Sequence, residues 1–322
     1  MAQALSFTHD QQKAIDHRKG HLRIIACPGS GKTEVVSNRV ARLIENGVNP
    51  KSIVAFTFTE KAAEELKTRI RSILEKECPE RADFGDMFIG TIHSFCFFML
   101  KEIDPSYRSF DVLDDPKRVA FVSKPQNFFK NLKLVGLKKS HNLRHYDTIK
   151  RFLESADIVM TEDIDTRKLS NKRFAECYLA YRNLLEEEKY FDFSSIIHKF
   201  VKAVKEDREK QKEIASRVKH VIVDEYQDVN KIQEMLLEIL SKGADSVCVV
   251  GDDDQNIYHW RGSDVGIIRA FKQRYKKYNV TDIHIDTNFR STDAVIHTAR
   301  YFIEHNKVRL SKNMTSRKNL KR

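Results

Sequence analysis

The chain has 322 residues, of which 41% are hydrophobic, with 11 glycines and 6 prolines. This composition excludes a disordered or collagen-like chain and allows one large or two medium domains. Five well-separated cysteines without a CxxC pair indicate neither a disulfide framework nor a zinc site. Because the first twenty residues are polar and no apolar run approaches a membrane span, we expect a cytoplasmic protein with no membrane partner.

The net charge of +11 is concentrated in two segments. Residues 124–151 hold eight Lys or Arg against one acid, and residues 307–322 hold seven against none. Clustered basic residues predict a polyanionic partner, since Lys and Arg bind nucleic acid by neutralising phosphates. The alternatives are a solvated face for the first segment and a disordered end for the second.

A strand followed by a glycine-containing loop and a helix is expected near the N-terminus. Residues 22–26 form an apolar run typical of a buried parallel strand, and an amphipathic helix is predicted over 32–45. Pro28, Gly29 and Gly31 stop the strand between them. The segment fits GxxxxGK[ST], except that Ala26 stands at the first glycine.

Such a loop points backbone N–H groups at one spot, where a helix N-terminus also favours negative charge. We therefore predict polyphosphate binding by Gly29, Ser30 and Gly31. Lys32 would reach the terminal phosphates, and the Thr33 hydroxyl would bind Mg²⁺. The alternative is a turn that merely ends the strand.

Further strands and helices alternate along the chain. Apolar runs predict strands at 52–58, 87–90, 219–223, 246–250 and 283–291. Helices are expected from Thr8, from Thr59, after Gly90, and from Asn230 to Gly243. The pattern predicts an α/β fold, a parallel sheet with helices on both faces, whose ligands lie at the carboxyl ends of the strands.

The strand pattern stops in the middle of the chain. There the sequence predicts helices at 115–121, 127–134, 146–156 and 171–187. We therefore expect two halves of a sheet domain, residues 1–105 and 190–306, to flank a helical insertion, 106–189. A basic tail, 307–322, would follow.

Two adjacent carboxylates follow the strand predicted at 219–223. Asp224 can hold Mg²⁺ through water or Thr33, and Glu225 can take the proton of an attacking water. Surface Asp-Glu pairs are common, but a pair after a Val-Ile-Val strand downstream of a phosphate loop is not. We predict that both carboxylates face the phosphate loop.

Other polar and aromatic side chains also follow predicted strands. Gln255 can orient water or contact a γ-phosphate, Arg290 suits a phosphate oxygen, and Phe289 suits an adenine ring. An amide such as that of Gln12 can pair with the edge of adenine. Tyr258 and Trp260, the single Trp of the chain, offer flat faces on which nucleic-acid bases can stack. Phe58 and His93 also follow predicted strands at the same edge of the sheet, where packing at a strand end is the expected role of each taken singly.

Taken together, these motifs resemble the first motor domain, with its helical insertion, of a UvrD/Rep-type superfamily-one DNA helicase. The motifs that carry the resemblance are, in order, Phe7 to Gln12, Ala26 to Thr33, Thr57 to Ala63, Gly90 to Ser94, Val223 to Asp228, Gly251 to Gly262, and Asn288 to Ser291. They span nearly the whole chain except the insertion, which matches only in position and character.

The resemblance implies a RecA-like P-loop NTPase fold and hydrolysis of ATP with Mg²⁺, coupled to movement along single-stranded or partly duplex DNA, 3′ to 5′. Lys32, Thr33, Asp224, Glu225, Gln255 and Arg290 would then lie at the nucleotide. Phe58, His93, Tyr258 and Trp260 would lie along the DNA.

Helicases of this kind also need a second RecA-like domain, which we expect as a partner in a longer protein or in a separate chain. Without it, we expect nucleotide and weak DNA binding with little hydrolysis. One alternative is a regulatory or scaffold module of a DNA repair complex that binds nucleotide without cycling. A small-molecule kinase would leave Tyr258 and Trp260 unexplained.

Overall fold

The computed structural model describes residues 7–124, 145–258 and 262–318. The chain forms two compact units. The larger contains Met1–Ile92, Glu209–Val229 and Leu236–Arg322, and the smaller contains His93–Arg208 and Asn230–Met235. The expected boundaries at 105 and 189 therefore move outward. The reason is packing, since the Phe95 and Phe200 rings meet edge to face inside the smaller unit, 6.2 Å apart.

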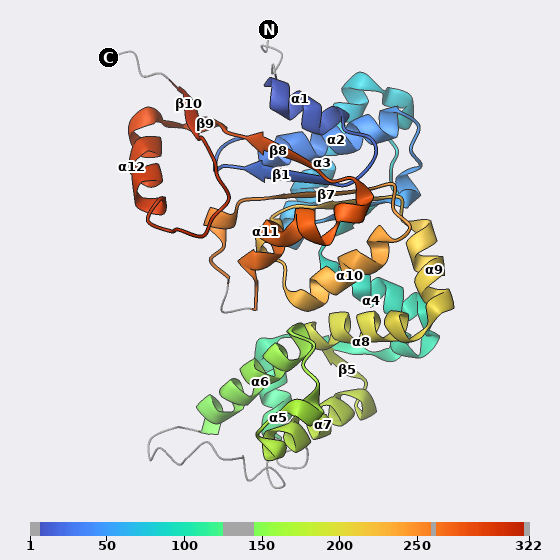
Figure 1. The fold of residues 1–322 in the computed structure, drawn as a ribbon. Coiled ribbons are helices and arrows are strands. Elements are labelled where there is room, and N and C mark those ends of the chain that lie inside the picture. Colours follow the sequence, from blue (N-terminus) through green and yellow to red (C-terminus); the bar gives the residue numbers. More distant parts are fainter. Residues whose placement is uncertain (1–6, 125–144, 259–261, 319–322) are drawn as a thin grey trace. The chain divides into compact units, whose positions relative to one another are not determined.

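The larger unit is built on a six-stranded sheet of order β3-β2-β6-β7-β1-β8, in which all neighbours are parallel (Figure 1). Its strands are β1 (Leu22–Ala26), β2 (Ile53–Phe56), β3 (Phe88–Gly90), β6 (His220–Val223), β7 (Ser246–Gly251) and β8 (Thr281–Ile285). The predicted α/β fold is confirmed. The predicted phosphate loop follows β1, which lies between β7 and β8 in the sheet.

Helices cover both faces of this sheet. Figure 1 shows α1, α2 and α3 on one face and α11 on the other. The helices of the larger unit are α1 (His9–Asp16), α2 (Lys32–Glu45), α3 (Glu60–Glu77), α9 (Arg208–Arg217), α11 (Val265–Arg274) and α12 (Asp293–Ile303). Helix α10 (Lys231–Ser241) contributes residues to both units.

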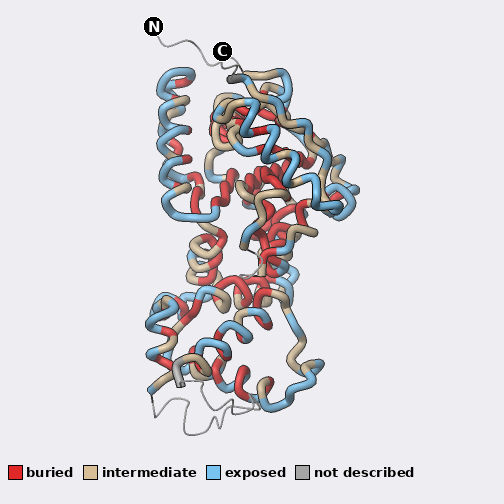
Figure 2. Tube along the Cα trace, turned by 90° about the vertical axis from the view of Figure 1, so that its left-hand side faces the viewer, coloured by how far each residue is buried: buried red, intermediate tan, exposed pale blue. Residues whose placement is uncertain are grey.

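The core of the larger unit consists of strand residues and the inward faces of α1 to α3. β1 is buried along its whole length, and Ile24 lies in register between Val250 of β7 and Ile283 of β8. In Figure 2 burial alternates along the helices, whereas the central strands are buried throughout. A rigid sheet therefore anchors the loops at its edge.

The strand expected over 283–291 is in fact two strands. The main sheet ends with β8, and after Asp286 the chain enters β9 (Thr287–Thr292). β9 pairs in parallel with β10 (Thr315–Lys318). The expectation of a basic tail over 307–322 is therefore wrong for its described part, which folds back onto the larger unit.

The smaller unit is mainly helical, as expected for the insertion. Its elements are α4 (Ile92–Ile103), β4 (Asp111–Leu113), α5 (Asp115–Ser123), α6 (His145–Thr161), α7 (Lys172–Glu187), β5 (Tyr190–Asp192) and α8 (Phe193–Glu206). The short β4–β5 pair was not expected. The helix predicted at 127–134, and most of the basic run 124–151, lie outside the described residues.

One buried ion-pair network organises this smaller unit. Arg118 on α5 donates to Asp157 on α6, and its Nε lies 3.1 Å from Oδ2 of Asp192, the last residue of β5. Tyr181 on α7 donates to Asp192 at 2.6 Å. Because unpaired buried charges are strongly unfavourable, this network fixes how these elements pack.

Candidate nucleotide site

The loop after β1 has the backbone of a phosphate loop. Gly29 and Gly31 adopt φ of +70° and +82°, a left-handed conformation that glycine accommodates without strain. A Cβ on Gly29 would lie 2.7 Å from Cβ of Arg290, so a side chain does not fit there. Gly31 is the N-cap of α2 and provides no capping side chain. The first N–H groups of α2 are thus left to bind an anion.

Strand β9 supports this loop through hydrogen bonds, and the sequence had not indicated this contact. Asn288 donates from Nδ2 to the carbonyl of Pro28 at 2.6 Å, and the N–H of Phe289 donates to the carbonyl of Gly29 at 2.9 Å. Two segments about 260 positions apart are thereby joined. The motif Asn288 to Ser291 therefore supports the loop through one side-chain and one backbone hydrogen bond.

Lys32 and the predicted carboxylates meet beside the loop. Lys32 Nζ lies 3.4 Å from Glu225 Oε2, and the Lys32 side chain is 10% exposed. Glu225 adopts φ of +51°, unusual for a residue with a side chain. Strain of this kind concentrates at functional sites. The structure therefore brings together the second and fifth predicted motifs, Ala26 to Thr33 and Val223 to Asp228.

Three carboxylates after β6, which we call the β6 cluster, are Asp224, Glu225 and Asp228. Burial and the neighbouring charge of Glu225 raise the pKa of Asp224 to about 6, although Lys32 opposes the shift. The same causes raise the pKa of Asp228 to about 6. The cluster is short of positive charge, which suits a divalent cation with oxygen ligands. Thr33, the second residue of α2, is the other predicted ligand.

The glutamine beside the loop is Gln11, not the predicted Gln12. Gln11 is 4% exposed and donates from Nε2 to the carbonyl of Ser30 at 3.0 Å. Gln12 instead donates to Asp16 on the surface at 2.7 Å. The missed signal was local: Thr8 and Gln11 form a capping box, which fixes Gln11 on the inner side of α1.

The remaining residues predicted at the nucleotide lie in a 3₁₀ helix after β7 and on β9. Gln255 ends a short 3₁₀ helix, Asp253–Gln255, and donates from Nε2 to Asp252 Oδ2 at 2.6 Å. Phe289 is half-buried, with the guanidinium of Arg317 5.4 Å from its ring centre, while Arg290 is exposed. One face of the Phe289 ring is thus already covered by the C-terminal segment.

Comparison with known proteins shows which protein family the chain belongs to. Residues 7–276 match the family described as "UvrD/REP helicase N-terminal domain". The chain belongs to the UvrD/REP helicase family. The resemblance drawn from the motifs is confirmed.

Three relatives illustrate the match. The chain is 33% identical to the ATP-dependent DNA helicase PcrA of Bacillus subtilis, over 94% of this chain and 40% of that protein. Against PcrA of Staphylococcus epidermidis the identity is 29%, over 95% and 41%. Against a probable DNA helicase II homolog of Mycoplasma capricolum it is 32%, over 95% and 42%. The chain therefore spans about two fifths of the length of these relatives. Within the described ranges, no helix is long and apolar enough to cross a bilayer.

In this helicase-family chain, two of the four residues predicted at DNA form a pair. The rings of Phe58 and Tyr258 stack with centres 5.0 Å apart and planes 25° apart. Phe58 is 36% exposed. His93 belongs to the smaller unit, where its ring meets Phe193 edge to face at 5.7 Å. Trp260 lies outside the described residues.

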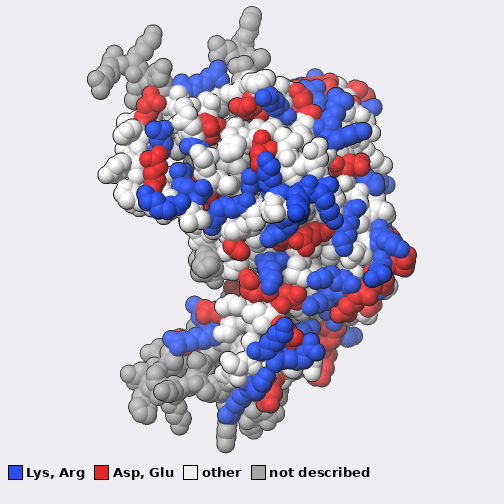
Figure 3. Space-filling model, in the orientation of Figure 1, with Lys and Arg blue, Asp and Glu red and all other residues white. Residues whose placement is uncertain are grey.

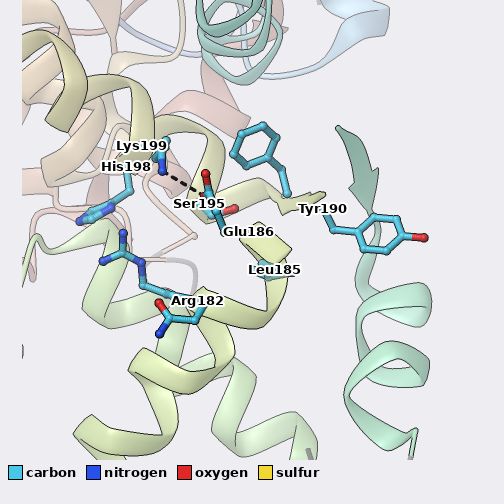
Figure 4. A pocket seen from close by; sticks show the side chains of 9 residues that line it. Arg182, Leu185, Glu186, Tyr190, Ser195, His198 and Lys199 are labelled. Carbon is cyan, nitrogen blue, oxygen red and sulfur yellow. Dashed lines mark hydrogen bonds and ion pairs between the residues drawn. The ribbon is translucent and has the colours of Figure 1, made fainter. Parts of the chain in front are cut away.

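A cavity lies elsewhere among the described residues, in the smaller unit between α7, β5 and α8 (Figure 4). It has a volume of about 200 Å³ and holds none of the predicted site residues. Lys199 on its wall donates to Glu186 at 3.0 Å, and burial lowers the pKa of His198 to about 4. The candidate nucleotide site, in contrast, is a surface of backbone groups and charged side chains at the edge of the sheet.

Proposed function

We propose that this chain binds Mg²⁺-ATP and single-stranded DNA as the ATP-binding motor portion of a UvrD/PcrA-type, ATP-dependent DNA helicase. The observation that carries the proposal is the meeting of three features: the left-handed Gly29–Gly31 loop, Lys32, and the cation-deficient β6 cluster. This combination of uncapped N–H groups, one lysine and paired carboxylates suits a magnesium polyphosphate.

Each residue then has a distinct task. Gly29, Ser30 and Gly31 hold the phosphates, and Thr33 and Asp224 hold Mg²⁺, which neutralises phosphate charge when bound. Lys32 pairs with Glu225 at 3.4 Å until phosphate competes for its ammonium group. Glu225 is then released to accept a proton from the attacking water. Gln255 orients that water, and Arg290 donates to a γ-phosphate oxygen.

Adenine recognition falls to Gln11, in place of Gln12, together with Phe289. Gln11 is fixed against the phosphate loop, and the Phe289 backbone is bonded to Gly29. The DNA bases stack on the Phe58–Tyr258 pair, and His93 and Trp260 have the DNA-binding roles that the motif resemblance implies. The motor moves along the DNA strand in the 3′ to 5′ direction, as the motif resemblance implies.

The lengths of the relatives support a division of labour. Since this chain spans about two fifths of them, we propose that a second RecA-like domain, in the same polypeptide or a separate chain, completes the motor. Arginines supplied across such an interface accelerate hydrolysis by ~10³–10⁵. This chain alone is then expected to bind nucleotide and hydrolyse it slowly.

The test is a binding titration with a fluorescent ATP analogue in the presence of Mg²⁺. Lys32→Ala removes the ammonium group that faces the phosphates, so we expect affinity to fall about 100-fold, equivalent to about 2.7 kcal/mol. Lys76→Ala, which removes an exposed lysine on α3, should leave affinity within twofold. Equal affinities of the two variants would contradict the nucleotide assignment.

A second arm of the same experiment tests DNA. Quenching of Trp260 fluorescence by oligo(dT) reports binding, since this is the one Trp of the chain. Phe58→Ala should weaken that binding about 5- to 100-fold, because stacking contributes roughly 1–3 kcal/mol per base. Tyr301→Ala, at an exposed aromatic on α12, is the matched control. Binding of a small phosphorylated metabolite in place of oligo(dT) would favour a kinase.

A further inference from the structure

A second group of carboxylates follows β7, the strand next to β6 in the sheet. We call Asp252, Asp253 and Asp254 the β7 cluster. Their side chains are 1%, 2% and 14% exposed. Three buried neighbouring carboxylates repel one another and lose hydration, so a group of this kind persists only where cations compensate it.

The cations come from the C-terminal segment, residues 307–318. Lys312 Nζ lies 2.6 Å from Asp253 Oδ1 and 2.7 Å from Asp254 Oδ2, and it also pairs with Asp252 Oδ1. The Lys312 side chain is 3% exposed. Its ammonium group therefore occupies the point where the three carboxylates converge, the place that a bound metal ion would take.

Two further contacts from this segment close the cluster. Arg309 pairs with Asp254 through both Nε and Nη2, with 3.0 Å from Nε to Oδ1. The N–H of Leu310 donates to Asp253 Oδ2 at 2.7 Å. Burial alone would lower the pKa of Lys312, but the carboxylates outweigh it and raise that pKa. On the face in Figure 3, Lys and Arg gather in a band over the larger unit with Asp and Glu among them.

Asp252 links this cluster to Gln255, one of the residues predicted to contact the nucleotide. Its Oδ1 is bound by Lys312, and its Oδ2 accepts from Gln255 Nε2 at 2.6 Å. Lys312 and Gln255 thus hold the two oxygens of one carboxylate. A change at one oxygen alters the position of the carboxylate, and hence of the amide at the other.

Asp252 is also bonded toward the β6 cluster. Its N–H donates to Gln227 Oε1 at 3.0 Å, and Gln227 Nε2 donates to Glu225 Oε2 at 2.8 Å. Gln227 is 2% exposed and uses both ends of its amide. A continuous path of hydrogen bonds and ion pairs therefore runs from Lys32 through Glu225, Gln227 and Asp252 to Lys312.

We propose that Lys312 is a positioning residue for the nucleotide site: by holding Asp252 it fixes the Gln255 amide where it contacts the terminal phosphate of ATP. The inference rests on the proposed function, and it adds that the C-terminal segment belongs to the site's supporting structure. The contacts single out Lys312 for this role, since no other described lysine contacts all three β7 carboxylates.

The test compares binding of Mg²⁺-ATPγS with binding of Mg²⁺-ADP, because only the former carries a third phosphate group. In Lys312→Gln we expect ATPγS affinity to fall about 5- to 10-fold while ADP affinity stays within twofold. Lys312→Arg should restore the preference, since a cation of either type can hold Asp252. Lys307→Gln, at an exposed lysine of the same segment, should behave as wild type. Should Lys312→Gln not fold, Asp253→Asn added to it lowers the uncompensated charge.

The possible results distinguish a failure of the positioning role of Lys312 from a failure of the proposed nucleotide binding. Equal losses of ADP and ATPγS affinity, an unchanged preference in Lys312→Gln, or no preference in wild type would overturn the positioning role. If wild type binds neither nucleotide, the proposed function fails instead. Hydrogen exchange of residues 251–258 then decides the inference: uptake should rise in Lys312→Gln and not in Lys307→Gln, and equal uptake in both refutes it.

Discussion

The β6 and β7 clusters are two groups of three acids on neighbouring strands of one sheet, and they are in opposite electrostatic states. In the β6 cluster the pKa values of Asp224 and Asp228 are both raised to about 6. In the β7 cluster, hydrogen bonds from Arg309 and Lys312 outweigh burial and lower the pKa of Asp254. The sign of the shift follows the supply of cations, not the number of acids.

This difference suggests what each cluster is for. The β6 cluster has one lysine at 3.4 Å, so it retains negative charge for a ligand cation. The β7 cluster has an ammonium group at its centre and a guanidinium at its rim, so its charge is largely met within the chain. One cluster is open to Mg²⁺, and the other is a closed support for Gln255.

The sharpest test of the comparison is the same substitution in both clusters. Lys312→Met leaves buried carboxylates unpaired and should lower the free energy of unfolding by about 3–5 kcal/mol. Lys32→Met breaks a longer, partly exposed pair and should cost less than about 1 kcal/mol in the absence of nucleotide. Urea unfolding followed by circular dichroism measures both. Similar losses would mean that the clusters do not differ in this way.

The next test concerns ligand-dependent stability. A ligand at 100 times its dissociation constant stabilises the folded state by about 2.7 kcal/mol. We expect Mg²⁺-ATPγS to confer this stabilisation on wild type and on Asp254→Asn, but to confer little on Asp224→Asn. Urea unfolding with and without ligand, and with EDTA to remove Mg²⁺, gives the comparison. Full stabilisation of Asp224→Asn would exclude Asp224 as the principal Mg²⁺ ligand.

Much of the scaffold could be predicted from sequence because its determinants are local. A short apolar run such as 22–26 is typical of a strand buried in a parallel sheet. A glycine that can adopt a left-handed conformation, such as Gly29, allows the turn that follows the strand. The acids after β6 were found for the same reason. The family followed from the order of these local signals.

The errors arose where the outcome depends on contacts distant in sequence. Gln11 and Gln12 are one helical step, about 100°, apart, and only the phase of α1 decides which faces Ser30. The composition of 307–318 is that of a frayed end, because Lys312 gains its role only when it meets acids about 60 positions away. The smaller unit's boundaries likewise depend on ring packing between α4 and α8.

The smallest expected effect gives the most direct test of the opposite pKa shifts of Asp224 and Asp254. Because the pKa of Asp224 is raised, ionising this carboxyl group lowers the stability of the folded state; the loss begins above about pH 4, the ordinary pKa of Asp, and is complete above about pH 6. In metal-free buffer at pH 7.5, Asp224→Asn should therefore raise the free energy of unfolding by about 1 kcal/mol. Asp254 has a lowered pKa, so Asp254→Asn should instead lower it by about 1 kcal/mol.

The pH dependence distinguishes these effects from simple packing changes. The advantage of Asp224→Asn should stay level from pH 7.5 to about pH 6 and then decline toward zero by about pH 4, because folded wild-type Asp224 takes up a proton below about pH 6 while the unfolded chain stays ionised until about pH 4. Asp254 stays ionised from pH 7.5 to pH 5, so the deficit of Asp254→Asn should persist to pH 5. Urea midpoints at half-unit pH steps give both curves. An advantage of Asp224→Asn that stays constant from pH 7.5 to pH 4 would show that charge is not its cause, because only ionisation links this substitution to the proton concentration.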